Sequence, residues 1–201
     1  MALSRSEQKR LDIINAAKLV FKENGVQATS MDKLAEVANV SKRTVYNHFK
    51  TKEELVMHLV KELWQKAMLS SEDDYDKTAP LAPQLTKILM KEISLMNSPD
   101  YIDLSRVAMG HFLFQPEALQ VEIEKFSKQE TSLQLWLENA TNDGLLTVKN
   151  IELAVQQLHG LIKGSCFWPQ LLGLCPLLSE QEQINLADES VAMFLARYAN
   201  S

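Results

Sequence analysis

The sequence predicts an all-α protein of about nine helices, with a three-helix N-terminal domain over residues 1–52 and a helical bundle over residues 53–201. Three observations predict this fold. Apolar residues recur at helical spacing along most of the chain. Residues that cap helices precede these apolar stretches. No convincing strand or hairpin pattern competes with them. A length of 201 residues is enough for one or two domains with real cores.

Four helices are expected in the first 70 residues, and each begins at a Ser or Thr that can cap it. Ser4 and Thr51 are followed three residues later by Glu, which is the spacing of a capping box. Asn24-Gly25 supplies the left-handed stop of the first helix. The expected ranges are 4–24, 29–38, 41–49 and 51–70.

Five further helices are expected after an acidic loop at about residues 70–83. The Asp and Glu residues of this loop are interpreted as solvated and not as a metal site, because no histidine accompanies them. Pro169 is expected to kink the fourth of the five helices. The expected helices cover 81–96, a segment that begins at 98–99, 116–142, 150–172 and 179–199.

Charge is unevenly distributed along the chain. Residues 1–52 hold ten Lys/Arg and five Asp/Glu, whereas the remainder holds eleven Lys/Arg and twenty-one Asp/Glu. A basic head on an acidic body predicts that the head meets a polyanion. No apolar run is long enough for a transmembrane helix or resembles a signal peptide, so a cytoplasmic protein without membrane contact is expected. Cys166 and Cys175 are expected as free thiols, and no metal or other cofactor is expected.

The second and third helices are joined by about three residues, which is the arrangement of a helix-turn-helix whose second helix enters the DNA major groove. Val45 and Phe49 share a face that is expected to pack inward. The opposite face then carries cations and hydrogen-bonding groups. Cations attract phosphates, and Lys42 and Arg43 can reach guanine edges. The alternative is a solvated charged face, which any one of these side chains taken alone would favour.

Residues 28–56, "ATSMDKLAEVANVSKRTVYNHFKTKEELV", resemble the DNA-binding signature of the TetR/AcrR family of bacterial transcriptional regulators. The resemblance covers about residues 8–60. The family often has Gly where this chain has Arg43, and this departure bears on which base is preferred. The matching positions are Thr29-Ser30, Leu34-Ala35, Ala38, Val40-Ser41, Thr44-Val45-Tyr46, His48-Phe49, Lys52-Glu53 and Leu55.

The resemblance implies an α-helical homodimer that binds a near-palindromic operator, with the last two helices of each subunit forming a four-helix bundle. It implies that some side chains face bases and that others, Lys52 among them, hold phosphates. Free N–H groups at helix starts can hold further phosphates. The expected DNA-binding residues are Thr29, Ser30, Lys42, Arg43, Thr44, Tyr46, Asn47, His48 and Lys52.

Residues 160–173, "GLIKGSCFWPQLLG", resemble the AefR-like subset of the family's C-terminal domains. Gly160 and Gly164 lie on one helix face and permit close approach of another helix. This fits a dimer interface, and it equally fits a buried core helix. The expected interface residues are His159, Gly160, Gly164, Phe167 and Trp168.

Aromatic and methionine side chains in the central helices form a candidate pocket for an apolar effector. Plain core packing is the alternative for each of them. His111 and His159 are expected in structural roles and not as metal ligands. The candidate pocket residues are Trp64, Met68, Met90, His111, Phe112, Phe114 and Trp136.

The function expected from the sequence is that of a DNA-binding regulator, a repressor released from its operator by a small apolar effector. An activator, or a redox-responsive regulator that uses Cys166, is the alternative on the same scaffold. An enzyme is not expected, because the sequence has no nucleophile elbow, phosphate loop or zinc-protease motif. Cys166 and His159 lie seven residues apart but lack an orienting third group. A scaffold that acts through protein partners is disfavoured by the concentrated basic head.

Overall fold

The computed structural model describes residues 4–68, 75–113, 117, 120 and 131–200. They divide into two compact units, which are treated separately: residues within Met1–Glu62 and Asp103–Ile123, and residues within Leu63–Ile102 and Glu124–Ser201. The described secondary structure is helical apart from an isolated bridge between Leu146 and Ala199. The predicted all-α class is therefore confirmed.

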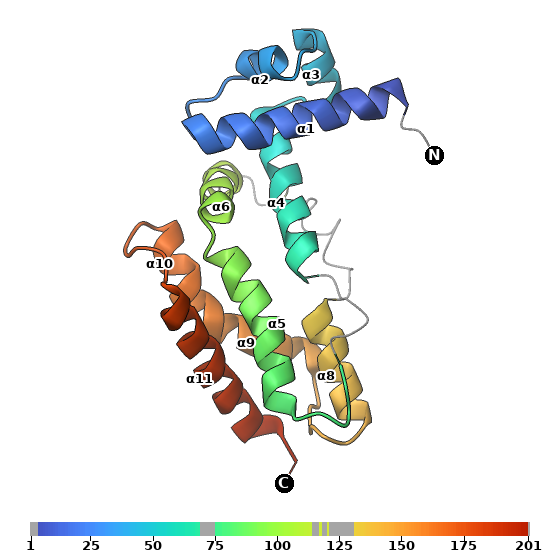
Figure 1. Cartoon of the computed structure of the whole chain (residues 1–201), viewed down its shortest axis with the longest axis vertical. Helices are drawn as coiled ribbons and strands as arrows, with labels where there is room; N and C mark the ends of the chain where they lie inside the picture. Colours follow the sequence, from blue (N-terminus) through green and yellow to red (C-terminus); the bar gives the residue numbers. More distant parts are fainter. Residues whose placement is uncertain (1–3, 69–74, 114–116, 118–119, 121–130, 201) are drawn as a thin grey trace. The chain divides into compact units, whose positions relative to one another are not determined.

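The first unit is built on three helices that pack on one another, as Figure 1 shows at the N-terminal end of the chain. The bounds of its helices are α1 Arg5–Asn24, α2 Met31–Val37, α3 Lys42–His48, α4 Lys52–Met68 and α6 Pro99–Phe112, of which α4 and α6 also contribute residues to the second unit. Its small core centres on Leu34, Val45 and Phe49, all of which are at most 2% exposed. Burial of these side chains holds α2 and α3 together despite their short length.

The capping predictions in the first unit are mostly confirmed. Ser4 and Glu7 form a closed capping box, and Ser41 caps α3. The second helix differs from the prediction, because its cap is Ser30 and not Thr29. The Thr29 side chain is buried and its hydroxyl donates to the Gly25 carbonyl at 2.9 Å. Sequence spacing alone did not distinguish the two neighbouring hydroxyl residues.

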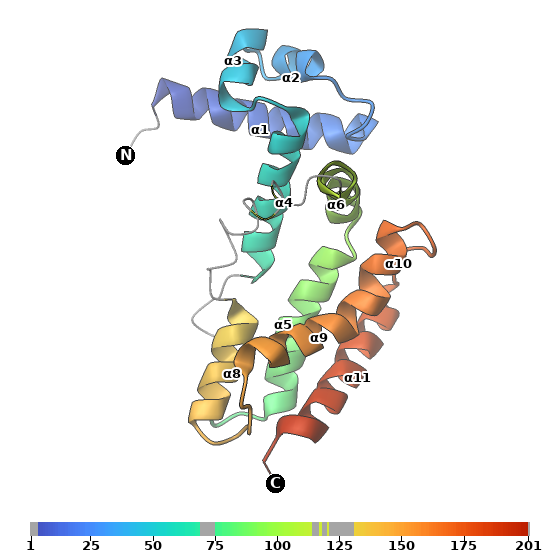
Figure 2. The ribbon, with the colours of Figure 1, turned by 180° about the vertical axis from the view of Figure 1, so that it is seen from behind.

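The second unit is a helical bundle in which α11 packs along both α5 and α9; Figure 2 shows α9 crossing in front of α5. Its helices not yet described are α5 Leu81–Met96, α8 Ser132–Asn142, α9 Ile151–Cys166, α10 Trp168–Leu171 and α11 Glu180–Tyr198. Trp136, Leu85 and Ile93 lie at the centre of one continuous apolar core. In the described ranges no helix has the length and apolarity needed to cross a bilayer.

Two predicted long helices are each interrupted. The helix expected over 150–172 is not kinked at Pro169 but broken at Phe167, whose φ of −132° and ψ of −63° separate α9 from α10. Pro169 then stands in the first turn of α10, where its missing N–H costs no helical hydrogen bond. The helix expected over 116–142 does not run unbroken to its end, because Thr131 has extended backbone and caps α8. Most of residues 116–130 lie outside the described part.

Candidate DNA-binding surface

Helices α2 and α3 are joined by a tight turn that fixes the orientation of α3. Asn39 has a φ of +51°, a left-handed conformation that Asn tolerates better than most residues. The next amide, of Val40, donates to the Ala35 carbonyl at 3.0 Å. Ala35 is 6% exposed and has the small side chain that close packing of α2 and α3 requires.

Helix α3 buries one edge and presents the other. Val45 is fully buried, whereas Arg43, Asn47 and Tyr46 are exposed, Tyr46 by 44%. Thr44 and His48 are half-buried, and the Thr44 hydroxyl lies 2.8 Å from the Ser41 hydroxyl. The exposed edge therefore offers a guanidinium, a phenol and a carboxamide, groups that hydrogen-bond to base edges and phosphates.

Lys42 lies at the start of α3 and forms an ion pair with Asp32 of α2, with 2.6 Å between Nζ and Oδ2. The hydrogen bond to Asp32 raises the pKa of Lys42, and the nearby Asp32 charge adds to this effect. Both side chains are well exposed. A phosphate must therefore compete with Asp32 for this ammonium.

Lys52, which is expected to hold phosphate, contacts the protein backbone in this DNA-free structure. Its ammonium donates to three carbonyl oxygens in the segment between α1 and α2: those of Val26 at 2.9 Å, Gln27 at 3.2 Å and Thr29 at 3.2 Å. A lysine has three N–H donors, and these contacts occupy all of them. In this structure Lys52 joins the start of α4 to the backbone that precedes α2.

A second cation of the first unit also has a structural role that the sequence did not reveal. The Arg10 guanidinium lies over the Phe49 ring at 4.9 Å and contacts both ring nitrogens of His58 at 3.4–3.5 Å. Burial lowers the pKa of His58, and the Arg10 charge lowers it further. The neutral imidazole can accept from Arg10, so this contact links α1 to α4.

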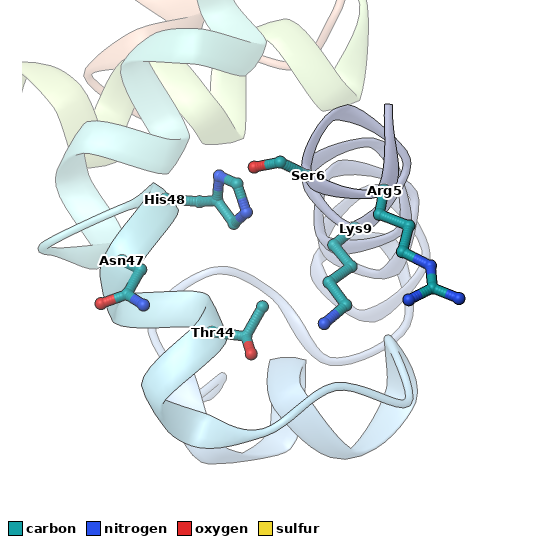
Figure 3. Close-up of a pocket in the computed structure, with 6 residues that line it drawn as sticks. All are labelled: Arg5, Ser6, Lys9, Thr44, Asn47 and His48. Carbon is teal, nitrogen blue, oxygen red and sulfur yellow. The ribbon is translucent and has the colours of Figure 1, made fainter. Parts of the chain in front are cut away.

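An open cleft of about 470 Å³ lies between the first turns of α1 and the exposed side of α3. It is lined by Arg5, Ser6, Lys9, Thr44, Asn47 and His48, and Figure 3 shows the His48 ring and the Lys9 side chain directed into the space between the two helices. Arg5, Ser6 and Lys9 were absent from the predicted set. The four-residue spacing of Arg5 and Lys9 could have indicated a basic stripe on one face of α1.

The candidate effector-pocket residues do not all lie in the described part. Trp136 is 1% exposed in the core, and its indole N–H donates to Gln84 at 3.2 Å. Trp64 and Met90 are half-buried and pack against the same core. The side chains of Met68, His111 and Phe112, and the whole of Phe114, lie outside the described residues.

The candidate interface residues lie in α9, at its end and in α10, and they divide between a buried and an exposed face. The His159 Nε2 and Glu92 Oε2 atoms are hydrogen-bonded at 3.0 Å, and Phe167 contacts the Tyr101 ring. Gly160 and Gly164 are exposed, and a Cβ added at either would meet nothing within 4 Å. Trp168 is 44% exposed. Among the residues that the structure describes, the glycine face is therefore open.

The two thiols differ in environment, which gives a first prediction. Cys166 is fully buried, and burial raises its pKa to about 12. Cys175 is exposed. With an aromatic disulfide reagent at pH 8 we expect one thiol per chain to react quickly, and the second only after unfolding, because the thiolate is the nucleophile. The Cys175→Ser variant should lose the fast phase. Two fast thiols in the folded protein would support the redox-responsive alternative.

Comparisons with known proteins agree on one family. Residues 13–59 match the description "Bacterial regulatory proteins, tetR family", and residues 83–200 match "AefR-like transcriptional repressor, C-terminal domain". A crystal structure of a TetR family transcriptional regulator from Pseudomonas syringae pv. tomato str. DC3000 is 35% identical, with a TM-score of 0.75, and the match covers 97% of this chain and 99% of that one.

Curated relatives match over shorter spans. The fatty acid metabolism regulator protein of Bacillus subtilis (strain 168) is 31% identical over 94 residues, 47% of this chain and 48% of the relative. The regulator UidR of Escherichia coli (strain K12) is 25% identical over 136 residues, 68% of this chain and 60% of the relative. The match thus spans about half of the first relative's length and less than two thirds of the second's.

Proposed function

The chain belongs to the TetR family of bacterial regulatory proteins, with an AefR-like C-terminal domain, and from that premise we propose that it is a homodimeric DNA-binding repressor that a small effector releases from its operator. The observation that carries the proposal is the exposed edge of α3, where Arg43, Tyr46 and Asn47 stand on a helix whose other edge is buried. We assign residues 1–52 to DNA binding and residues 53–201 to effector binding and dimerisation.

The proposed dimer rests on the open face of α9 and α11. A Cβ added at Gly160 or Gly164 of α9 would meet no described atom within 4 Å, and Ala192 and Ala196 of α11 are exposed as well. Leu161 and Met193 add exposed apolar surface, Met193 by 52%. Small residues beside apolar ones suit close packing of helices from a second copy, and a symmetric dimer uses the same face of each copy.

The test of the proposed function is selection of bound duplexes from a random DNA pool, followed by sedimentation of the protein with and without the selected duplex. We expect an inverted repeat with half-sites about one helical turn apart, because two α3 helices of a symmetric dimer must reach the same side of the duplex. A pool that yields no enriched sequence, or a protein that sediments as a monomer at micromolar concentration, would contradict the proposal.

Arg43 is the residue proposed to read a base, and its substitution gives a second prediction. Arg43→Ala should cost about 1–3 kcal/mol in operator binding and relax the preference at one operator position, since a bidentate contact to a base edge is lost. Competition assays with single-position operator variants measure both effects.

The matched control is Arg43→Lys. It keeps the charge but not the planar pair of donors. This variant should retain the dependence of affinity on salt while losing most of the base preference. A loss that is the same for every sequence in both variants would assign Arg43 to the phosphate backbone instead.

Effector binding gives a third prediction, one of reciprocity. An effector that weakens operator binding by a given factor, typically about 5–150-fold, must itself bind more weakly by the same factor when operator is present. Support for an apolar effector comes from the half-buried Trp64 and Met90 beside the core. Long-chain acyl thioesters are the first probes to try, because one relative is named a fatty acid metabolism regulator and a Bacillus subtilis regulator of similar fold was solved with stearoyl-CoA.

The measurement begins with a thermal-shift screen of apolar metabolites and acyl thioesters. Each hit is then titrated by calorimetry with and without the selected operator. A ligand that binds with equal affinity in both conditions is no inducer, since it cannot shift an equilibrium between states that it binds equally.

A further inference from the structure

The cleft between α1 and α3 has the chemistry of an anion site. Its lining contributes two cations, Arg5 and Lys9, and hydroxyl, carboxamide and imidazole groups, with no carboxylate and no aliphatic or aromatic hydrocarbon side chain. Pockets for apolar ligands are lined mainly by hydrophobic side chains. This cleft therefore does not suit the apolar effector proposed for the second unit.

The cations of the cleft are available to a ligand. The ion pairs found among the described residues include neither Arg5 nor Lys9. The neighbouring carboxylate, Glu7, accepts from the Ser4 amide at 2.8 Å and is thereby held in the capping box of α1. Arg5 and Lys9 are four residues apart, so both stand on the same side of the helix.

The two walls of the cleft contribute different donors. Lys9 and His48 point into the space between the helices, whereas the Arg5 guanidinium extends away from α3 (Figure 3). Helix α1 supplies the two cations and the Ser6 hydroxyl, and α3 supplies Thr44, Asn47 and His48 (Figure 3). The α1 residues precede the segment, 13–59, that the family description covers.

The geometry points to a clamp for one phosphate group of the DNA backbone, held between α1 and α3 beside the bases that the exposed edge of α3 reads. This inference rests on the proposed function. Charge-assisted hydrogen bonds from Arg and Lys to phosphate are short and strong. A backbone contact of this kind fixes the register of α3 in the groove and carries no sequence information itself.

The first test compares the Arg5→Ala/Lys9→Ala variant with the Lys22→Ala variant. Lys22 is an exposed lysine on the same helix, about 20 Å from Lys9 at 1.5 Å per residue. Affinity for the selected operator is measured over a series of salt concentrations. The double variant should lower the slope of log affinity against log salt by about 1 for each clamped phosphate, hence about 2 per dimer. The Lys22→Ala control should keep the wild-type slope. If the double variant also keeps the wild-type slope, the clamp is overturned.

The second test locates the phosphate. Operators are made with a neutral methylphosphonate at one backbone position at a time. The wild-type protein should lose affinity at each phosphate that it contacts, and at one symmetric pair of these positions the double variant should lose nothing further. Equal losses for both proteins at every position would overturn the inference.

Two further measurements distinguish a DNA phosphate from a soluble phosphate ester, and failure of the clamp from failure of the proposed function. If ATP, as a probe of free phosphate esters, binds the DNA-free protein through Arg5 and Lys9 while no operator phosphate couples to them, the cleft serves a soluble anion and the DNA clamp is overturned. If the wild-type protein selects no DNA at all, the proposed function fails. If it selects DNA but the slopes of wild type and double variant agree, only the clamp fails.

Discussion

Raising the salt concentration from 50 to 200 mM is expected to weaken operator binding by about 10³–10⁵-fold. The estimate holds for a dimer that makes about 6–10 phosphate contacts, each of which releases condensed counterions. Residues 1–52 of each subunit hold ten Lys/Arg and five Asp/Glu, so the two N-terminal domains of a dimer supply enough cations for about 6–10 phosphate contacts. The measurement is fluorescence anisotropy of a labelled operator across the salt series.

Two controls make this result specific. An unrelated duplex of equal length should bind more weakly but with a similar dependence on salt, because the backbone contacts are shared. The acidic remainder of the chain should not reverse the trend, since charges beyond a Debye length of about 10 Å are largely screened. A salt response that is nearly flat would leave the basic head without a role in DNA binding.

Truncation of Trp136 is expected to destabilise the second unit by about 3–5 kcal/mol. The side chain is 1% exposed and packs among Leu85, Leu133 and their neighbours. Trp136→Ala would leave a cavity and also deprive the Gln84 carboxamide oxygen of the indole N–H. Urea unfolding followed by circular dichroism measures the loss.

Trp136→Phe is the matched control, because it keeps most of the apolar volume and removes only the N–H donor. A loss of about 1 kcal/mol is expected for it, as for one hydrogen bond. If Trp136→Ala costs less than about 1 kcal/mol, the side chain lines an existing cavity. Trp136 would then belong to the effector pocket and not to the core.

Local signals predicted the N-terminal unit well, because its helices begin at residues whose capping chemistry is readable in the chain. Ser4 and Ser41 cap α1 and α3 as their spacing predicts, and in the second unit Ser179 caps α11 in the same way. One such signal was overlooked: Thr131 and Gln134 have the spacing of a capping box, and the Thr131 hydroxyl does accept from the Gln134 amide.

Features that depend on tertiary contacts could not be predicted in the same way. The apolar pattern continues through Phe167, so the break there has no local marker, and only the backbone conformation reveals it. The cleft is formed by α1 and α3 together, so the sequence of neither helix alone predicts it. Cys166 is a candidate redox sensor from the sequence, whereas its burial and raised pKa lead us to expect a slowly reacting thiol.

The three carbonyl contacts of Lys52 have a mechanical consequence. They join the first turn of α4 to the backbone on which α2 begins, and the Arg10–His58 contact joins a later turn of α4 to α1. Rotation of α4 therefore cannot leave α1 and α2 behind without breaking hydrogen bonds at both points. We therefore expect α1, α2 and α3 to move with α4 as one rigid body. A signal that reaches α4 would then reorient α3 without deforming it, and in the proposed dimer it would change the spacing between the two copies of α3.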